Sequence, residues 1–180
     1  PTGGRTLDVA AADYDGDGWT DVAVSTYGGF NVLWNDGGGG FASRDDHGVA
    51  DGDCYGLAVA DMDRDGRSDL VMAFSPGSWY RASTLAWVRN AGGRAFAGGG
   101  RYFFWPSYSV TTATWLGVAD VDGDGREDLV AAALDPSGYD PSLLWIMRRI
   151  RGRVFEGFQD YDYPLTSPAP PGPEPFVNVA

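Results

Sequence analysis

The chain has 180 residues and a formal net charge of −12 at pH 7, enough length for one sizeable hydrophobic core and an acidic balance. All 13 basic residues are arginines, and they form no stripe that could meet phosphates, which excludes nucleic acid as a partner. The single cysteine, Cys54, excludes an internal disulfide and a thiolate metal cluster, and no apolar run approaches the length of a membrane span.

Residues 7–41 contain the first set of predicted elements. A short apolar run leads into the aspartate-rich phrase DYDGDGWTD at 13–21, and a second apolar run follows at 22–25. A run ending at Trp34 comes next, then NDGGGGF, which is typical of a hairpin turn because glycine accepts positive φ. Short runs rich in β-branched and aromatic residues, bounded by glycine and Asx, predict strands.

The same order of elements returns twice. The phrase DMDRDGRSD at 61–69 precedes an apolar run at 70–74, and DVDGDGRED at 120–128 precedes one at 129–134. Each is followed by a run with a tryptophan, and we interpret Trp34, Trp87 and Trp145 as repeat-matched residues that pack between repeats. Glycine is abundant, with 27 residues, and no segment keeps a helical period, so the sequence predicts an all-β protein.

Three or four strands per repeat is the content of one β-propeller blade. We therefore divide the chain into blade-like repeats at 1–48, 49–107 and 108–163, followed by a proline-rich connection and the start of a further repeat at 164–180. The final PFVNVA resembles the LDVA and LGVA that lead into the acidic phrases. Propellers close with four to eight blades, so we expect part of a longer propeller, completed by the same or another chain.

The three phrases, called here the first, second and third acidic segments, share the pattern D-x-D-x-D-G-x-x-D. In a tight loop the carboxylates at positions one, three and five converge, the glycine permits the turn, the seventh residue offers its carbonyl, and the ninth closes the shell. An all-oxygen set of this kind is the preference of calcium; magnesium ranks second, and zinc lacks histidine or cysteine ligands. The predicted ligands of three calcium sites are Asp13, Asp15, Asp17, Trp19 and Asp21; Asp61, Asp63, Asp65, Arg67 and Asp69; and Asp120, Asp122, Asp124, Arg126 and Asp128.

Two alternatives compete with this interpretation. An EF-hand needs a glutamate at the twelfth position and flanking helices, but the twelfth residues are Val24, Met72 and Ala131 in strand-like runs. Aspartate-rich turns without metal are the second alternative, because Asp and Gly are common turn formers. Three copies with identical spacing favour calcium, in the role of a structural staple between two strands.

The three segments resemble FG-GAP repeats, also described as VCBS-like, which occur in integrin α heads, secreted bacterial proteins and some fungal lectins. The resemblance covers about residues 7–158 and is carried by the acidic phrases, with YGGF at 27–30 as a faint echo of the signature. It implies a β-propeller, usually seven-bladed, with calcium in these loops.

Aromatic residues in the turn-rich insertions are candidates for ligand contact, because a sugar ring stacks on an aromatic face while its hydroxyls form hydrogen bonds. The alternative is that these side chains cover strand edges or fill the core. The candidates are Trp79, Tyr80, Trp105, Tyr108 and Tyr139.

His47 is the only histidine, and it lies in an acidic stretch with Asp45 and Asp46. An acid–base pair is one interpretation, and a surface histidine in an acidic loop is the other. No serine stands in a nucleophile-elbow setting, so we identify no catalytic residue.

These features predict a non-enzymatic calcium-binding module for recognition of a carbohydrate or protein ligand, in a secreted, periplasmic or cell-surface setting. The resemblance to lectins and integrin heads supplies this function. A scaffold or appended domain of a secreted polysaccharide-degrading enzyme is the alternative, and an element that completes a propeller with another chain is a third.

Overall fold

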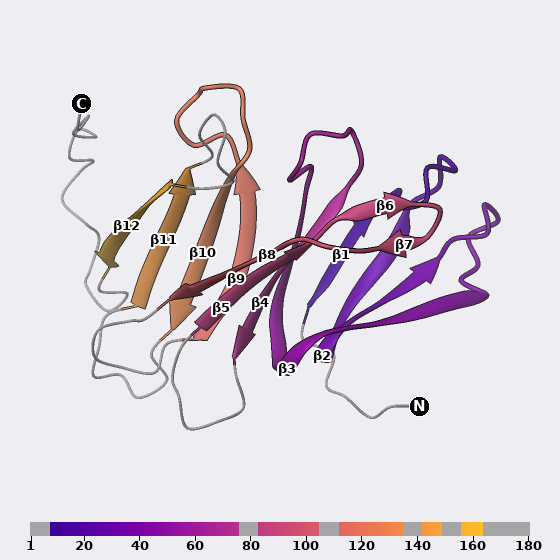
Figure 1. Ribbon diagram of the computed structural model, residues 1–180, viewed down its shortest axis with the longest axis horizontal. Coiled ribbons are helices and arrows are strands. Elements are labelled where there is room, and N and C mark those ends of the chain that lie inside the picture. The colour runs from indigo at the N-terminus through magenta and orange to yellow at the C-terminus, as the bar shows by residue number, and fades with distance from the viewer. Residues whose placement is uncertain (1–7, 76–82, 105–111, 135–141, 149–155, 164–180) are drawn as a thin grey trace.

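A computed structural model describes residues 8–75, 83–104, 112–134, 142–148 and 156–163 (Figure 1). The described residues form strands and no helix, as the sequence predicts, and accordingly no helix among them has the length and apolarity to cross a membrane. The strands are β1 (Val9–Ala12), β2 (Asp21–Trp34), β3 (Ser43–Ala60), β4 (Asp69–Ser75), β5 (Ser83–Val88), β6 (Asn90–Gly92), β7 (Ala95–Phe96), β8 (Gly100–Phe104), β9 (Thr112–Ala119), β10 (Asp128–Leu134), β11 (Ser142–Arg148) and β12 (Glu156–Tyr163).

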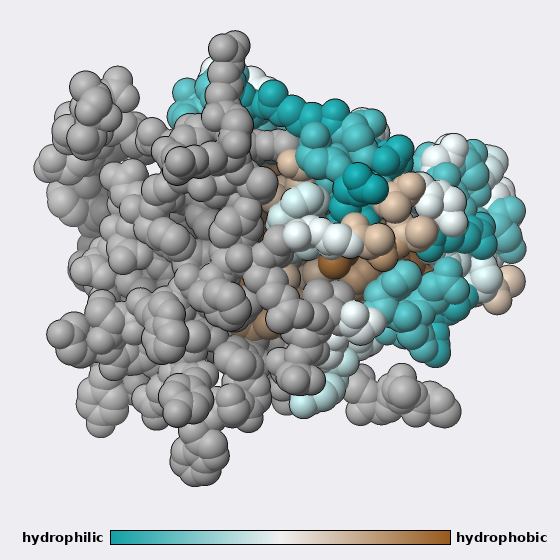
Figure 2. Space-filling view, in the orientation of Figure 1, coloured by the Kyte–Doolittle hydropathy of each residue, from teal (hydrophilic) through white to brown (hydrophobic). Residues whose placement is uncertain are grey.

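The strands form antiparallel sheets in which neighbours in the sequence are mostly neighbours in space. A six-stranded sheet has the order β1-β2-β3-β4-β5-β8, a four-stranded sheet has the order β12-β11-β10-β9, and β6 pairs with β7. Figure 1 shows the four-stranded sheet beside the six-stranded one, and the β6–β7 hairpin lying over β1 and β2. In the view of Figure 2, hydrophilic residues cover most of the described surface and surround a smaller hydrophobic area.

Strand β2 folds back on itself. A straight strand of 14 residues would span about 46 Å. The amide of Asn35, just after the strand, nevertheless donates to the carboxylate of Asp21 at its start, over 2.8 Å. Gly28, with φ of 79°, lies near the middle and has the left-handed backbone that a reversal requires. β2 therefore supplies two antiparallel strand segments.

Strand β3 joins two repeats. Its residues 43–48 pair with β2, and its residues 53–60 pair with β4. The described chain thus contains three four-stranded units: unit 1 is β1, both parts of β2 and the first part of β3; unit 2 is the second part of β3 with β4, β5 and β8; unit 3 is β9 to β12. The connection through β3 makes units 1 and 2 one continuous sheet.

The hydrophobic core lies in two clusters, and β4 contributes to both. Leu70 and Met72 belong to a cluster that includes unit 1, whereas Val71 and Ala73 belong to a cluster that includes unit 3. Successive side chains of a strand point to opposite faces, so the unbroken apolar run at 70–74 is explained by burial on both sides. Complete burial of a Leu or Met side chain contributes about 1.5–3 kcal/mol.

The three repeat-matched tryptophans are only partly equivalent. Trp34 is buried in the cluster that joins units 1 and 2, and Trp87 packs against the cluster that joins units 2 and 3, which confirms packing between repeats for these two. The register, however, pairs Trp87 with Val71, two residues after Asp69, and Trp145 with Ala131, three residues after Asp128. The expected match between Trp87 and Trp145 is therefore wrong by one position.

Candidate metal centre

Each acidic segment occupies the same place in its unit. It is the loop between the first and second strand segments, and its ninth aspartate pairs in register with the alanine that precedes the loop. The pairs are Ala12 with Asp21, Ala60 with Asp69, and Ala119 with Asp128. The identical spacing in the sequence thus corresponds to an identical hairpin register.

The first aspartate of each segment winds the loop around its carboxylate. Asp13 accepts hydrogen bonds from the amides of Gly16 at 2.7 Å and Gly18 at 2.9 Å. Asp120 accepts from Gly123 and Gly125, both at 2.8 Å. In the second segment Asp61 accepts from the amides of Asp65 at 3.1 Å and Gly66 at 3.0 Å.

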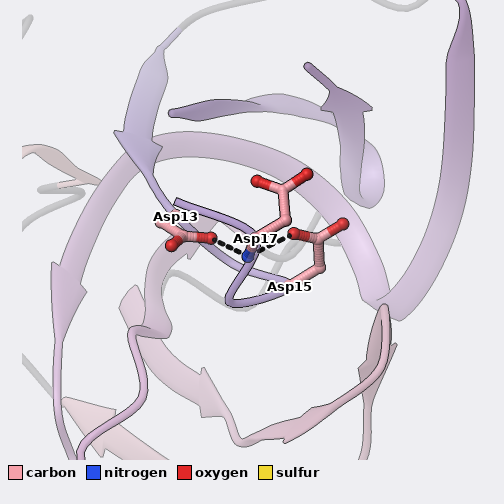
Figure 3. A group of neighbouring side chains, drawn as sticks. All are labelled: Asp13, Asp15 and Asp17. Carbon is pink, nitrogen blue, oxygen red and sulfur yellow. Dashed lines mark hydrogen bonds between the residues drawn. The ribbon is translucent and has the colours of Figure 1, made fainter. Parts of the chain in front are cut away.

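The third and fifth aspartates repeat one pattern as well. The third accepts from the amide of the fifth at 3.2 Å in all three segments. The fifth accepts from the amide of the seventh residue at 2.8–3.0 Å. Figure 3 shows the carboxylates of Asp13 and Asp15 turned toward the amide of Asp17.

Backbone conformation explains the glycines of the pattern and reveals one exception. The sixth position has φ of 79–90° in every segment and is always glycine. The fourth position is also left-handed, with φ of 81° at Gly16 and 75° at Gly123, but the second segment has Arg64 there with φ of 65°. A non-glycine residue in this conformation costs roughly 1–2 kcal/mol.

The ninth aspartate is buried, unlike the others. Asp21 and Asp69 are 0% exposed and Asp128 is 1% exposed. Asp21 accepts from the amides of Tyr14 at 3.0 Å and Asn35 at 2.8 Å, and Asp69 accepts from those of Met62 at 2.8 Å and Asn90 at 2.7 Å. Hydrogen bonds to both oxygens make burial of a carboxylate tolerable and fix its position under the loop.

The electrostatics of the second segment favour a cation. Burial raises the pKa of Asp69; the amides of Asn90 and Met62 oppose this shift, and the nearby Asp63 and Asp65 add to it. Like charges that raise a carboxyl pKa are stabilised by a positive ion among them.

Carboxylate oxygens converge in all three segments. Within each group the ligand atoms lie within 4.8 Å of one another, and the groups are Asp13, Asp15 and Asp17; Asp61, Asp63 and Asp69; and Asp120, Asp122 and Asp128. Oxygens that share one calcium ion at 2.3–2.6 Å lie at most about 5 Å apart. The residues present therefore fit calcium, and the predicted carbonyl ligands of Trp19, Arg67 and Arg126 stay predictions.

Arginines near the carboxylates were not foreseen from the sequence. Arg126 pairs with Asp124 at 2.7 Å, and Arg67 pairs with Asp65 in the same way, from the seventh position to the fifth. In the first segment the seventh residue is Trp19, and the arginine comes instead from unit 2: Arg94 bonds Asp15 at 2.8 Å. The alternation of Asp and Arg in the second and third segments could have indicated the Arg67–Asp65 and Arg126–Asp124 pairs, whereas nothing in the sequence indicated the pair of Arg94 with Asp15.

Two asparagines anchor the acidic segments to the hairpins that follow, and sequence reasoning missed them. Asn35 donates to the carbonyl of Thr20 at 2.9 Å, and Asn90 donates to that of Ser68 at 3.1 Å. Asn90 also donates to the carbonyl of Tyr14 at 2.7 Å, which links unit 2 to the first segment. The recurring N-x-G-G that opens both hairpin turns was the available signal.

The other predicted site residues have two outcomes. The ligand candidates Trp79, Tyr80, Trp105, Tyr108 and Tyr139 lie outside the described residues. His47 lies in strand β3 and not in a loop, half-buried, with its ring stacked on Phe30 at 4.8 Å between centroids. The expectation of a surface histidine in a loop is therefore wrong, whereas the interpretation of His47 as part of an acid–base pair stays a prediction.

Comparison with known proteins agrees with this geometry. Residues 13–72, from the first acidic segment through the second and into β4, match the family described as FG-GAP-like repeat, which agrees with the resemblance. No curated protein matches the chain.

Proposed function

We propose that this chain is a calcium-stabilised module of β-propeller type that acts in extracellular recognition. Support comes from the FG-GAP-like repeat region and from the three antiparallel units, which have the strand content of propeller blades. The units pack face to face through continuous hydrophobic clusters, as consecutive blades do.

The observation that carries the calcium proposal is the threefold repetition of one loop geometry. Three carboxylates converge in each segment, those of positions one, three and five in the first and of positions one, three and nine in the second and third, and the ninth aspartate is buried in all three. Acidic side chains at such close range repel one another, and a divalent cation removes that repulsion. Calcium suits the oxygen donors and the irregular geometry better than magnesium.

The ion's role in this proposal is structural. The carboxylates already engage the backbone of their own loop, and the loop joins two core strands, so binding links metal occupancy to folding. Chemistry at the ion is not part of the proposal, and the module is non-enzymatic. Recognition of a carbohydrate or protein falls to surfaces away from the loops, outside the cell, where free calcium is high enough to fill weak sites.

Thermal unfolding of the 180-residue chain with calcium and with a chelator tests the proposal. At free calcium of about one hundred times Kd each site contributes about 2.7 kcal/mol. For a chain of this size this corresponds to roughly 5–10 °C in Tm per site. Calcium added back should restore the Tm, and the same concentration of magnesium should restore less of it.

Single substitutions assign the effect to the loops. Asp15→Asn, Asp63→Asn and Asp122→Asn should each lower the bound calcium by one ion per chain, measured by equilibrium dialysis. Asp36→Asn is the matched control, because Asp36 is an exposed aspartate that caps amides in a neighbouring turn without joining a carboxylate cluster. Unchanged stoichiometry in all three loop variants would refute the calcium sites.

A further inference from the structure

Units 1 and 3 each have one sheet face that no other unit covers in the part of the chain that the structure describes. Unit 2 lies between them, and both of its faces are buried in the two hydrophobic clusters (Figure 1). The matched hairpin registers, in which Ala12, Ala60 and Ala119 pair with the ninth aspartates, assign to each residue of one unit its counterparts in the other two. The exposure of each position can therefore be compared between covered and uncovered units.

The face of unit 1 that is directed away from unit 2 is called here the outer face of unit 1. On it Val9 is 59% exposed, whereas its counterparts Leu57 and Leu116 are 4% and 5% exposed, because the preceding unit packs on each of them. Phe41 and Phe96 end the matched hairpin turns NDGGGGF and NAGGRAF. Phe96 packs against the cluster that joins units 1 and 2, but Phe41 is 45% exposed. The outer face of unit 1 thus has the residues of a covered face without its cover.

The strands of unit 1 also have the sequence of a sheet that is covered on both faces. Val22 and Val24 lie half-buried on the outer face, and their counterparts in unit 2, Leu70 and Met72, are both 0% exposed. A face of an antiparallel sheet that stays in water usually carries polar residues at alternate positions. The outer positions of β1 and of the first part of β2 instead carry valine and alanine, which favours burial against another sheet.

Unit 3 has the complementary kind of open face, called here the outer face of unit 3. Val121 is 40% exposed at the second position of its acidic segment, whereas Tyr14 and Met62 at the matched positions are 1% and 4% exposed. Those two residues lie in the clusters that their units share with the unit that follows. Val130 is half-buried, and its counterpart Val71 is 1% exposed. The outer face of unit 3 therefore corresponds to the faces with which units 1 and 2 cover their successors.

An exposed tryptophan lies on the outer face of unit 3. Trp115 is 55% exposed and precedes Leu116, which packs on unit 2, so the Trp115 side chain is directed away from unit 2. Its ring lies across Gly117, where an added Cβ would meet the ring atoms. Tryptophan is enriched among the residues that dominate the binding energy of protein interfaces.

We propose that the outer face of unit 1 binds the outer face of unit 3 in a second copy of this chain. Each chain carries both sides of a contact that already occurs twice within it, between units 1 and 2 and between units 2 and 3. Such a contact is head-to-tail, and it forms a ring when the rotation closes. Two chains with three units each give six units, within the four to eight blades of closed propellers.

The contact accounts for most of the exposed apolar surface. Six large hydrophobic residues are exposed among those that the structure describes, and four of them lie on the two outer faces: Val9, Phe41, Trp115 and Val121. Burial of these side chains against one another supplies the hydrophobic driving force for association. The inference rests on the proposed β-propeller type of the module, but it concerns the faces of the units and not their acidic segments.

Sedimentation velocity of the 180-residue chain in excess calcium, over a range of protein concentrations, tests the contact. The expected species is a dimer with twice the mass of one chain, and its Tm should rise with protein concentration because association stabilises the folded state. A monomer at every concentration would overturn the proposal and would assign the two outer faces to units of a different chain.

Val9→Arg and Trp115→Arg each place a charge on one outer face. Each alone should weaken the dimer at least tenfold, because burial of an unpaired charge is costly. Tyr27→Arg is the control, since Tyr27 is 65% exposed but alternates with Ala23 and Ser25, away from the outer face, and it should leave the association unchanged. Unchanged calcium stoichiometry shows that each variant is folded.

A mixture of the two charged variants separates a head-to-tail contact from a symmetric one. The Val9→Arg chain keeps its outer face of unit 3, and the Trp115→Arg chain keeps its outer face of unit 1. At concentrations where each variant alone is monomeric, the mixture should form dimers through one intact contact. A dimer that both variants retain at full affinity, or a mixture without dimers, would refute the contact. A monomeric chain with intact calcium stabilisation removes only the assembly, whereas absence of that stabilisation removes the proposed calcium module.

Discussion

The first and second acidic segments have the same aspartates at the same spacing and nearly the same hydrogen bonds, but their surroundings differ. The first has glycine at position four and Trp19 at position seven, and it receives Arg94 from the hairpin of the next unit. The second has Arg64 and Arg67 at those positions, and Arg67 lies on its own segment's fifth aspartate. The repeat pattern therefore defines the loop, and residues outside the pattern define the environment of its carboxylates.

Both segments also contact the unit that follows them. In the second segment the amide of Asp61 donates to Glu127 of the third at 3.3 Å, and the first segment is contacted by side chains of the β6–β7 hairpin. Arg94 contacts Asp15, Ser43 and the face of Trp34, with its guanidinium carbon 4.8 Å from the ring centroid. Asn90 reaches the carbonyl of Tyr14 from the same hairpin. The β6–β7 hairpin, which follows β5 of unit 2, therefore contributes contacts that hold the first segment in place.

The largest expected effect is a difference in the free energy of unfolding between variants of the two anchoring asparagines, Asn90 and Asn35. Asn90→Ala leaves the buried carbonyl of Tyr14 without its donor and removes the bond to Ser68, which should lower the free energy of unfolding by about 2–3 kcal/mol. Asn35→Ala loses one donated bond, to the exposed carbonyl of Thr20, and should cost about 1 kcal/mol. Both variants also lose the bond accepted from the glycine amide two residues further on, so this loss does not separate them. Urea unfolding in excess calcium measures both.

Asn31→Ala is a control for the loss of a side-chain amide, since Asn31 bonds only an exposed aspartate, and it should cost less than about 0.5 kcal/mol. Equal losses in Asn90→Ala and Asn35→Ala would show that the link between the units contributes nothing, and would break the comparison.

The all-β class and the acidic loops could be predicted because both depend on local pattern. Position-specific glycines and aspartates at fixed spacing dictate a turn whatever surrounds it. Burial of the ninth aspartate was harder to predict, because its neighbours in the sequence are of the same kind as those of the exposed aspartates in the segment. Its second partner, the amide of Asn90 or Asn35, lies 21 or 14 residues further along the chain and comes close only after folding.

Contacts between units could not be predicted from one sequence. Arg94 and Asp15 are 79 residues apart, and nothing in either segment indicates the other. The misplaced match of Trp87 and Trp145 has a related cause, since a one-residue shift in register is not visible in a pattern of apolar residues.

Exchange of the seventh residue should alter calcium affinity at the second segment. Arg67→Trp copies the first segment and removes a positive charge beside Asp65, so calcium should bind this site about threefold to tenfold more tightly at low salt. Competition with a chromophoric chelator measures the change. The reverse substitution, Trp19→Arg, should weaken the first site by a similar factor.

Arg44→Ala is the matched control, because it removes one positive charge from an exposed ion pair with Asp46, which belongs to no acidic segment. The effect of Arg67→Trp should also shrink as salt rises, since a screened charge acts weakly. Equal affinity changes in Arg67→Trp and Arg44→Ala would mean that only net charge matters and that the arginine on Asp65 has no local role.

The smallest expected effect concerns the fourth position, where the first segment has Gly16 and the second has Arg64 in a left-handed conformation. Arg64→Gly removes a left-handed side-chain penalty of roughly 1–2 kcal/mol and adds about 0.5–1 kcal/mol of chain entropy in the unfolded state. The net result should be a gain of about 0.5 kcal/mol in the free energy of unfolding. Gly16→Ala, at the matching place in the first segment, should lose about 1 kcal/mol by the reverse argument. No atom lies within 4 Å of the added Cβ, so no steric clash adds to this loss.

Both variants leave the carboxylates and the seventh residue untouched, so chemical unfolding with saturating calcium isolates the backbone term. Opposite signs for the two substitutions would show that both loops follow one backbone path and that the second tolerates strain at Arg64. A loss in both would mean that the Arg64 side chain stabilises the second segment by more than its conformation costs, and the segments would then differ in how each loop is held as well as in its surroundings.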